Sequence, residues 1–159
     1  MSDNQPTPTQ NRIVVGVDGS PLSQQALRWA HFLARATGST IEAVITWEPL
    51  AASYGGAPTG WKAVPYDQNV AEDAQSVLVD TLTAVFGEQL PPGLQTTVRE
   101  GSAAKILLDV SSGARMLVLG SRGHGGFAGL LLGSVSAACA EHATCPVLVV
   151  HGTTPPPPA

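Results

Sequence analysis

The sequence predicts an α/β fold: a doubly wound parallel sheet of five strands, in the order 3-2-1-4-5, with helices on both faces. Three observations lead to this prediction. Short apolar runs alternate with longer segments of helical period along most of the chain. The runs 13–17 and 116–119 are continuous, as in strands buried on both faces of a parallel sheet. The second run is followed by a glycine-rich stretch, and such sheets bind ligands beyond their carboxyl strand ends.

The first strand, residues 13–17, ends at Asp18. Pro21 suits the first turn of a helix, and apolar residues then recur at helical spacing, so we expect a helix from about Leu22 to Thr37 that Gly38 ends. Residues 40–47 form the second strand, with mixed burial because Glu42 interrupts its apolar pattern.

Residues 48–66 contain several glycines and prolines without any period, which predicts a long loop. A regular apolar stripe then predicts a helix over about 67–86, packed against the sheet and ending at Gly87. The third strand, 94–99, alternates in polarity as expected of a strand toward a sheet edge. It leads through Gly101 into a short helix.

The strand 116–119 follows, then the glycine-rich loop, a helix over 134–142 and a last strand, 146–150. We therefore expect one domain over residues 11–152. The polar residues 1–10 and the proline-rich residues 153–159 are expected to be disordered tails. The alternative for the second tail is a docking peptide for an aromatic-lined groove.

The glycine-rich loop has the properties of an anion site. Its glycines let the backbone approach a ligand without a Cβ in the way, so that successive N–H groups can converge on phosphate oxygens. The next helix adds unpaired N–H groups and the positive end of its dipole. Ser134 can act as N-cap or as a direct phosphate ligand, Arg122 is a permanent cation, and His124 is a conditional one. The loop glycines are Gly120, Gly123, Gly125 and Gly126.

The spacing Gly120-x2-Gly123-x9-Gly133-Ser134 resembles the nucleotide-binding signature of the universal stress protein family. Two further stretches are similar to that family. Ile13-Val14-Val15-Gly16-Val17-Asp18-Gly19-Ser20 resembles its first strand with the acidic end, and Cys145-Pro146-Val147-Leu148-Val149-Val150 resembles its closing strand. The resemblance covers about residues 11–152 and implies a Rossmann-like protein of the stress response that binds ATP.

The strand order makes a separate prediction about the site. In the order 3-2-1-4-5 the winding reverses between strands one and four, which brings Asp18 beside Gly120. Asp18 could accept a hydrogen bond from a ribose hydroxyl or hold Mg²⁺ against phosphates; the alternative is an Asx-turn that caps the next helix. The resemblance implies that Asp18 and the loop bind ATP and that adenine lies near Ala43–Thr46, although Thr46 stands where an apolar residue is expected.

The expected site is a binding site without catalytic residues. No Gly-x4-Gly-Lys-Ser/Thr loop is present, so a P-loop mechanism is excluded, and His124 is expected to contact phosphate or solvent. The alternatives are a slow Mg-dependent ATPase that uses Asp18 and His124, and a module that binds cAMP or another protein. The residues expected to bind the nucleotide are Gly16, Asp18, Thr46, Gly120, Ser121, Arg122, Gly123, His124, Gly125, Gly126, Gly133, Ser134 and Val135, and Asp18 is also the expected Mg²⁺ ligand.

Composition and charge narrow the partners. The net charge is −4, and the eight Lys and Arg residues are scattered, which argues against nucleic acid or an anionic membrane. No apolar stretch approaches the roughly 20 residues of a membrane span, and residues 1–6 lack a signal-peptide pattern, so we expect a cytoplasmic protein. Cys139 and Cys145 are expected to be small, reduced core residues. The apolar last strand lies at a predicted sheet edge, and the resemblance implies a homodimer through it.

Overall fold

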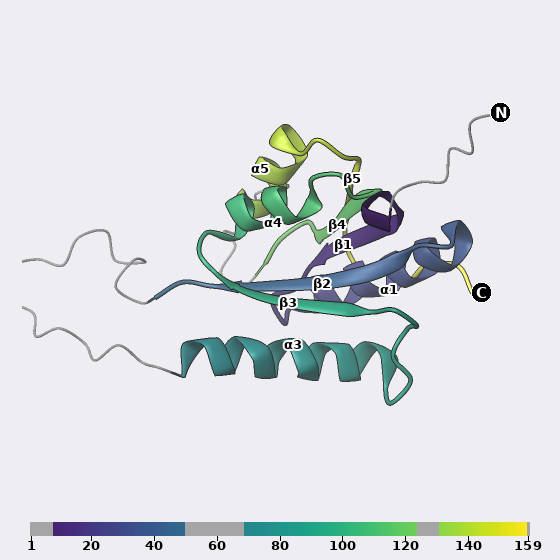
Figure 1. Cartoon of the computed structure of the whole chain (residues 1–159), viewed down its shortest axis with the longest axis horizontal. Coiled ribbons are helices and arrows are strands. Elements are labelled where there is room, and N and C mark those ends of the chain that lie inside the picture. The colour runs from purple at the N-terminus through teal and green to yellow at the C-terminus, as the bar shows by residue number, and fades with distance from the viewer. Residues whose placement is uncertain (1–7, 50–68, 124–130, 159) are drawn as a thin grey trace, which may run out of the picture.

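The computed structural model of the chain describes residues 8–49, 69–123 and 131–158. Its strands form one parallel five-stranded sheet in the order β3-β2-β1-β4-β5, which confirms the predicted fold class and strand order (Figure 1). A short 3-10 helix, η1 (Pro8–Asn11), precedes the sheet. The strands are β1 (Arg12–Gly16), β2 (Thr40–Trp47), β3 (Gln95–Glu100), β4 (Met116–Gly120) and β5 (Val147–Val150).

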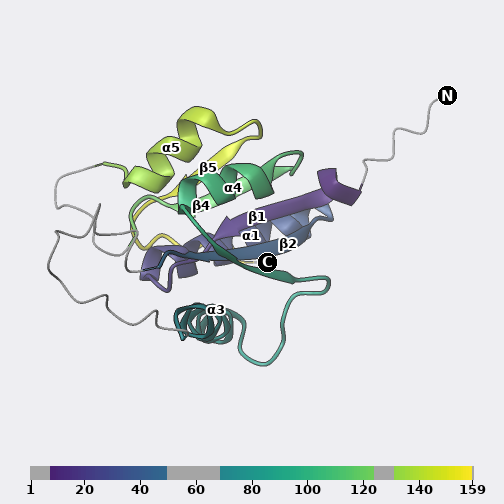
Figure 2. The same cartoon turned by 60° about the vertical axis from the view of Figure 1, so that its left-hand side comes forward.

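Helices cover both faces of the sheet, as Figures 1 and 2 show. Alternate residues of β1 belong to different cores: Ile13 and Val15 pack with α1 and α3, whereas Val14 packs with α4 and α5. This alternation follows from the two-residue period of a strand, and it explains why β1 is apolar throughout. The helices are α1 (Pro21–Thr37), α3 (Val70–Phe86), α4 (Ala103–Ser111) and α5 (Ser134–His142).

The ends of α1 follow from local chemistry. Ser20 is the N-cap, and its hydroxyl oxygen accepts a hydrogen bond from the Ser23 N–H at 3.2 Å. Pro21 occupies the first helical position, so α1 begins one residue before the predicted Leu22. Gly38 ends the helix with φ of 65°, a left-handed conformation that glycine adopts without strain.

The prediction of mixed burial for β2 was wrong, because Glu42 is itself buried. Its carboxylate accepts hydrogen bonds from Arg12 Nη1 at 2.5 Å and from Thr97 Oγ1 at 2.6 Å. Arg12 also donates through Nη2 to the Val110 carbonyl in α4 at 2.8 Å. A buried charge requires such partners, and this network joins β1, β2, β3 and α4.

None of the helices in the described part of the chain has the length and apolar character needed to cross a membrane.

Candidate functional site

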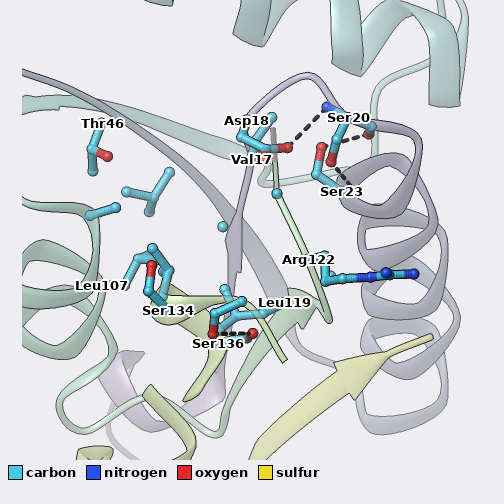
Figure 3. Close-up of a pocket in the computed structure, with 17 residues that line it drawn as sticks. Val17, Asp18, Ser20, Ser23, Thr46, Leu107, Leu119, Arg122, Ser134 and Ser136 are labelled. Carbon is cyan, nitrogen blue, oxygen red and sulfur yellow. Dashed lines mark hydrogen bonds between the residues drawn. The ribbon is translucent and has the colours of Figure 1, made fainter. Parts of the chain in front are cut away.

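A cavity of about 520 Å³ lies at the carboxyl end of the sheet, beside the ends of β1, β2 and β4 (Figure 3). It sits at the point where the winding of the sheet reverses, between β1 and β4, as expected for a ligand site in this architecture. Its volume lies within the range of roughly 300–1,000 Å³ that small-molecule sites occupy. The described lining residues are Gly16, Val17, Asp18, Ser20, Ser23, Val44, Thr46, Ala103, Leu107, Leu119, Gly120, Arg122, Gly123, Gly133, Ser134, Val135 and Ser136.

Asp18 joins the end of β1 to the start of α1. Its Oδ1 accepts a hydrogen bond from the Ser20 N–H at 2.9 Å, so the Asx-turn considered from the sequence is present. The carboxylate nevertheless lines the cavity. The turn fixes the side chain at the cavity wall, and a structural role and a binding role for Asp18 are therefore compatible.

The loop after β4 comes within contact distance of Asp18. A Cβ built on Gly123 would lie 2.5 Å from Asp18 Oδ2, so the two stretches that the strand order predicts to meet do so, about 100 residues apart in sequence. A glycine at this position leaves room for the carboxylate in its observed orientation.

Gly120 is constrained by a different neighbour. A Cβ at this position would lie 2.8 Å from Leu22 Cβ and 3.1 Å from the Leu22 carbonyl carbon, at the start of α1. The absence of a side chain therefore allows β4 to approach the α1 backbone directly.

The start of α5 is held against the loop by Ser121. The buried Ser121 accepts hydrogen bonds at its carbonyl from the Gly133 N–H at 2.7 Å and from the Ser136 hydroxyl at 2.8 Å. Gly133 is the N-cap of α5, so the alternative in which Ser134 is the N-cap was wrong. Ser134 is instead the first helical residue, and its side chain is exposed at the cavity.

Helix ends give the cavity a positive electrostatic character. The first intrahelical bond of α5 runs from the Ala137 N–H to the Gly133 carbonyl at 2.9 Å, so the N–H groups of residues 134–136 precede it. The helices α1 and α4 also begin at this edge, and Ser20, Ser23 and Ala103 contribute to the lining. Helix starts that converge in this way favour an anionic ligand.

Part of the cavity lining is apolar, and the sequence analysis largely missed it. Val44 from β2, Leu107 from α4 and Leu119 from β4 supply most of it, with Ala103 and Val135 beside them. Thr46 lies on the same side, across the cavity from Asp18 (Figure 3). The sequence signal for Leu107 was a helical apolar pattern, which indicates a buried face but does not indicate that the face extends to a cavity.

Not all of the residues expected to bind the nucleotide have side chains that face the cavity. Arg122 is exposed, and its side chain extends away from Ser134 in Figure 3, so its backbone contributes to the rim of the cavity. Ser121 lies behind the lining, as described above. The expectations for His124, Gly125 and Gly126 fall outside the described residues. The expected residues that line the cavity are Gly16, Asp18, Thr46, Gly120, Arg122, Gly123, Gly133, Ser134 and Val135.

Asp18 carries the one carboxylate among the described lining residues. The described part of the chain has no group of three or more His, Cys, Asp or Glu side chains that could hold a metal ion. Mg²⁺ is commonly held by one or two carboxylates together with the phosphates of a nucleotide. The donor set therefore fits a metal that arrives with its ligand, and it does not fit a metal held by protein groups alone.

Comparison with known proteins agrees with this architecture. The sequence model of the universal stress protein family matches residues 10–151. The chain belongs to this family. A universal stress protein of Mycolicibacterium smegmatis is 36% identical over 155 residues, which cover 91% of this chain and 49% of that protein. One from Mycobacterium tuberculosis is 32% identical over 146 residues, covering 87% of this chain and 47% of the relative. The chain thus spans about half the length of the curated relatives it matches.

Solved universal stress protein structures share the fold. The protein UspA from Lactobacillus plantarum matches with a TM-score of 0.69 and 20% identity, covering 88% of this chain and 97% of that one. A universal stress protein solved in complex with cAMP matches with a TM-score of 0.57 and 24% identity, covering 92% and 99%. One from Archaeoglobus fulgidus in complex with dAMP has a TM-score of 0.51 and 22% identity, covering 89% and 98%.

Proposed function

We propose that this universal stress protein binds ATP, with Mg²⁺, in the cavity between β1 and β4 and acts as a nucleotide-dependent regulatory protein. The observation that carries the proposal is the mixed lining of the cavity, which combines N–H groups at the start of α5 with the apolar side chains of Val44 and Leu107. Phosphates suit the N–H groups, and a purine suits the apolar side chains. The adenine nucleotides bound by two solved family members support this assignment.

In the proposed complex, the phosphates accept hydrogen bonds from the N–H groups of residues 134–136 and from the Ser134 hydroxyl. Charge-assisted hydrogen bonds contribute about 1.5–3 kcal/mol each, so a few of them suffice for micromolar affinity after association costs. Asp18 is the residue that would hold Mg²⁺ against the phosphates or accept from a ribose hydroxyl. The metal would neutralise phosphate charge that otherwise repels this carboxylate.

The first test is the nucleotide content of protein purified without added ligand, followed by calorimetric titration with Mg-ATP. The variant Ser134→Glu separates binding from folding. A carboxylate at a helix start stabilises the helix by about 0.3–1 kcal/mol, yet it repels phosphate from the same N–H groups. We expect equal or higher thermal stability with at least tenfold weaker Mg-ATP binding.

The matched control is Ala140→Glu, which adds the same charge to an exposed position near the other end of α5. It should leave Mg-ATP affinity unchanged. Equal affinity of the Ser134→Glu variant and the wild type would refute the placement of phosphates at the start of α5.

A cyclic nucleotide is the second candidate ligand, favoured by the family member solved with cAMP. Competition between ATP, AMP and cAMP, with and without Mg²⁺, distinguishes the two. If ATP with Mg²⁺ is the ligand, removing the metal weakens wild-type binding, and the variant Asp18→Asn loses that metal dependence. Tighter binding of cAMP than of Mg-ATP would replace the first assignment.

We also propose that the protein forms a homodimer through β5, which is an edge strand of the sheet. The Pro146 carbonyl accepts a hydrogen bond from the Leu117 N–H in β4, and the Val150 carbonyl accepts one from the Ser121 N–H just after β4. Strand alternation therefore directs the backbone groups of Val147 and Val149 toward the open edge. Val149→Pro should remove an edge donor while the β4 ladder is kept. Sedimentation should show a wild-type dimer and a monomeric variant; a wild-type monomer at high concentration would refute the proposal.

A further inference from the structure

The end of the chain runs back along α1 after β5. Val150 is buried as the last residue of β5, and Gly152, with φ of 61°, then turns the chain. Both cartoon views place the C-terminal end beside α1 (Figures 1 and 2). Residues 153–158, which were expected from the sequence to belong to a disordered tail, form neither strand nor helix.

Two side-chain donors of α1 hold this tail. Gln25 Nε2 donates to the Thr153 carbonyl at 3.2 Å, and Trp29 Nε1 donates to the Thr154 carbonyl at 3.1 Å. Gln25 and Trp29 are four residues apart, so they share one face of the helix, one turn apart. They bind the last two residues before the prolines.

The prolines continue along an aromatic groove between α1 and α3. Pro156 is half-buried, whereas the prolines on either side of it are exposed. Trp29 packs edge-to-face against Phe32, with ring centroids 6.1 Å apart, and His31 packs in the same way against Phe86 at 5.3 Å. A cavity of about 560 Å³ lies between the prolines and the two helices, and it is lined by Arg28, His31, Phe32, Arg35, Ala36, Val85, Phe86, Pro155, Pro156 and Pro157.

These contacts are the elements by which proteins recognise proline-rich peptides. Consecutive prolines favour a polyproline II helix, which has no internal hydrogen bonds and presents its carbonyls to external donors. An indole N–H supplies such a donor, and aromatic side chains supply the surface on which the rings pack. The preformed peptide conformation also lowers the entropy lost on docking.

We propose that the groove formed by Gln25, Trp29, Phe32 and Phe86 is a docking site for a proline-rich peptide, and that the chain's own residues 153–158 occupy it. This site lies on α1 and α3, outside the set of residues that lines the nucleotide cavity. The inference is therefore independent of the proposed nucleotide function, and the failure of one leaves the other intact.

The test uses full-length protein in which the four prolines are replaced, as Pro155→Gly, Pro156→Ser, Pro157→Gly and Pro158→Ser. In nitrogen-15-labelled protein, the indole N–H of Trp29 reports directly on the groove, and that of Trp47 in β2 is the internal control. We expect the replacement to shift the Trp29 signal and to accelerate its hydrogen exchange at least tenfold, with no change at Trp47. Unchanged exchange at Trp29 would overturn the proposal.

The second arm adds a synthetic peptide with the sequence of residues 153–159. It should bind the proline-replaced protein, return the Trp29 signal toward its wild-type position, and bind wild-type protein at least tenfold more weakly because the covalently attached tail competes. Equal binding to both proteins, or no binding to the replaced one, would overturn the proposal. A wild-type Trp29 signal that depends on protein concentration would also overturn it, since the occupant would then be the tail of a second copy.

Point variants of the proline-replaced protein identify the donors. Trp29→Phe keeps an aromatic ring but removes the N–H, and Gln25→Ala removes the second donor. Each should weaken the peptide about fivefold, the usual effect of one hydrogen bond; isothermal calorimetry measures this for both variants. Gln24→Ala, one position away on the same helix, should leave peptide affinity unchanged. Equal effects of Gln24→Ala and Gln25→Ala would contradict the assigned contacts.

Discussion

Gly120→Ala should mainly lower the stability of the protein, whereas Gly123→Ala should mainly weaken Mg-ATP binding, although both glycines line the same cavity. In Gly120→Ala, the new Cβ meets Leu22 Cβ at 2.8 Å, the Leu22 carbonyl carbon at 3.1 Å and its oxygen at 3.2 Å. Ordinary carbon contacts are roughly 3.5–4.0 Å. Since two of these atoms belong to the α1 backbone, relief requires β4 and α1 to move apart.

Overpacking of this kind costs about 1–3 kcal/mol. For a chain of this size, each kcal/mol lowers the melting temperature by roughly 2–4 °C. For the middle of the range, about 2 kcal/mol, Gly120→Ala should melt about 4–8 °C below the wild type. In Gly123→Ala, the one neighbour within 3 Å among the described residues is Asp18 Oδ2, at 2.5 Å, which is the tip of a side chain. Rotation of Asp18 relieves the conflict at the expense of one hydrogen bond to Ser20, worth about 1 kcal/mol.

Thermal denaturation followed by circular dichroism measures the first effect, and calorimetric titration with Mg-ATP measures the second. Gly123→Ala should melt within about 4 °C of the wild type, and it should bind Mg-ATP at least tenfold more weakly because Asp18 has left its position. A Gly120→Ala variant as stable as the wild type would refute the packing argument. A Gly123→Ala variant that is less stable than Gly120→Ala would refute the distinction between backbone and side-chain conflicts.

Three further predictions concern groups outside the cavity. Glu42→Ala leaves the guanidinium of Arg12 without its carboxylate and should lower the free energy of unfolding, measured by urea denaturation, by about 3 kcal/mol. Glu42→Gln should lose less. Equal losses would contradict the role given to the ion pair with Arg12. Burial, with a smaller contribution from Cys145, raises the pKa of the Cys139 thiol to about 11, so at pH 8 a thiol reagent should modify Cys145 in the native protein and spare Cys139. Labelling of the Cys139→Ser and Cys145→Ser variants measures the two reaction rates separately. Equal labelling rates of the two thiols would contradict the prediction. Burial and then the charge of Arg35 lower the pKa of His31, so the unfolded chain binds the proton more tightly than the folded protein does, and the free energy of unfolding should fall as the pH drops through about 6.5. Denaturation at pH 7.5 and 5.5 should show a smaller loss of this free energy for His31→Gln than for the wild type. Identical losses would show that His31 does not titrate in this way.

The fold was predictable because the apolar periods, the residues at helix ends and the alternation of strands and helices all indicate the same architecture. The continuous apolar run of β1 follows from burial on both faces, and Pro21 and Gly38 mark the ends of α1. The strand order then brings Asp18 and the loop glycines to one edge. These features depend on local periods and on a few topological rules, which a single sequence carries.

Other features depend on contacts between distant segments and were not predictable. Glu42 reads as an interruption of a strand, since its partner Arg12 is 30 residues away and meets it only through the register of β1 and β2. The place of Leu107 in the cavity wall depends on how far α4 extends over the sheet. Ser134 and Gly133 are both residue types that are common at an N-cap. In the structure the N-cap is Gly133, whose N–H donates to the Ser121 carbonyl, 12 residues away in the sequence.

The cavity is built from segments that leave the ribosome at very different times. Asp18 and Val44 are made early in synthesis, whereas Gly123 and Ser136 come from the last quarter of the residues printed above. Domains fold as units during synthesis, and a ligand stabilises only the state that binds it. The part of a ligand's stabilisation that comes from the N–H groups of residues 134–136 is therefore available only after these residues have been synthesised.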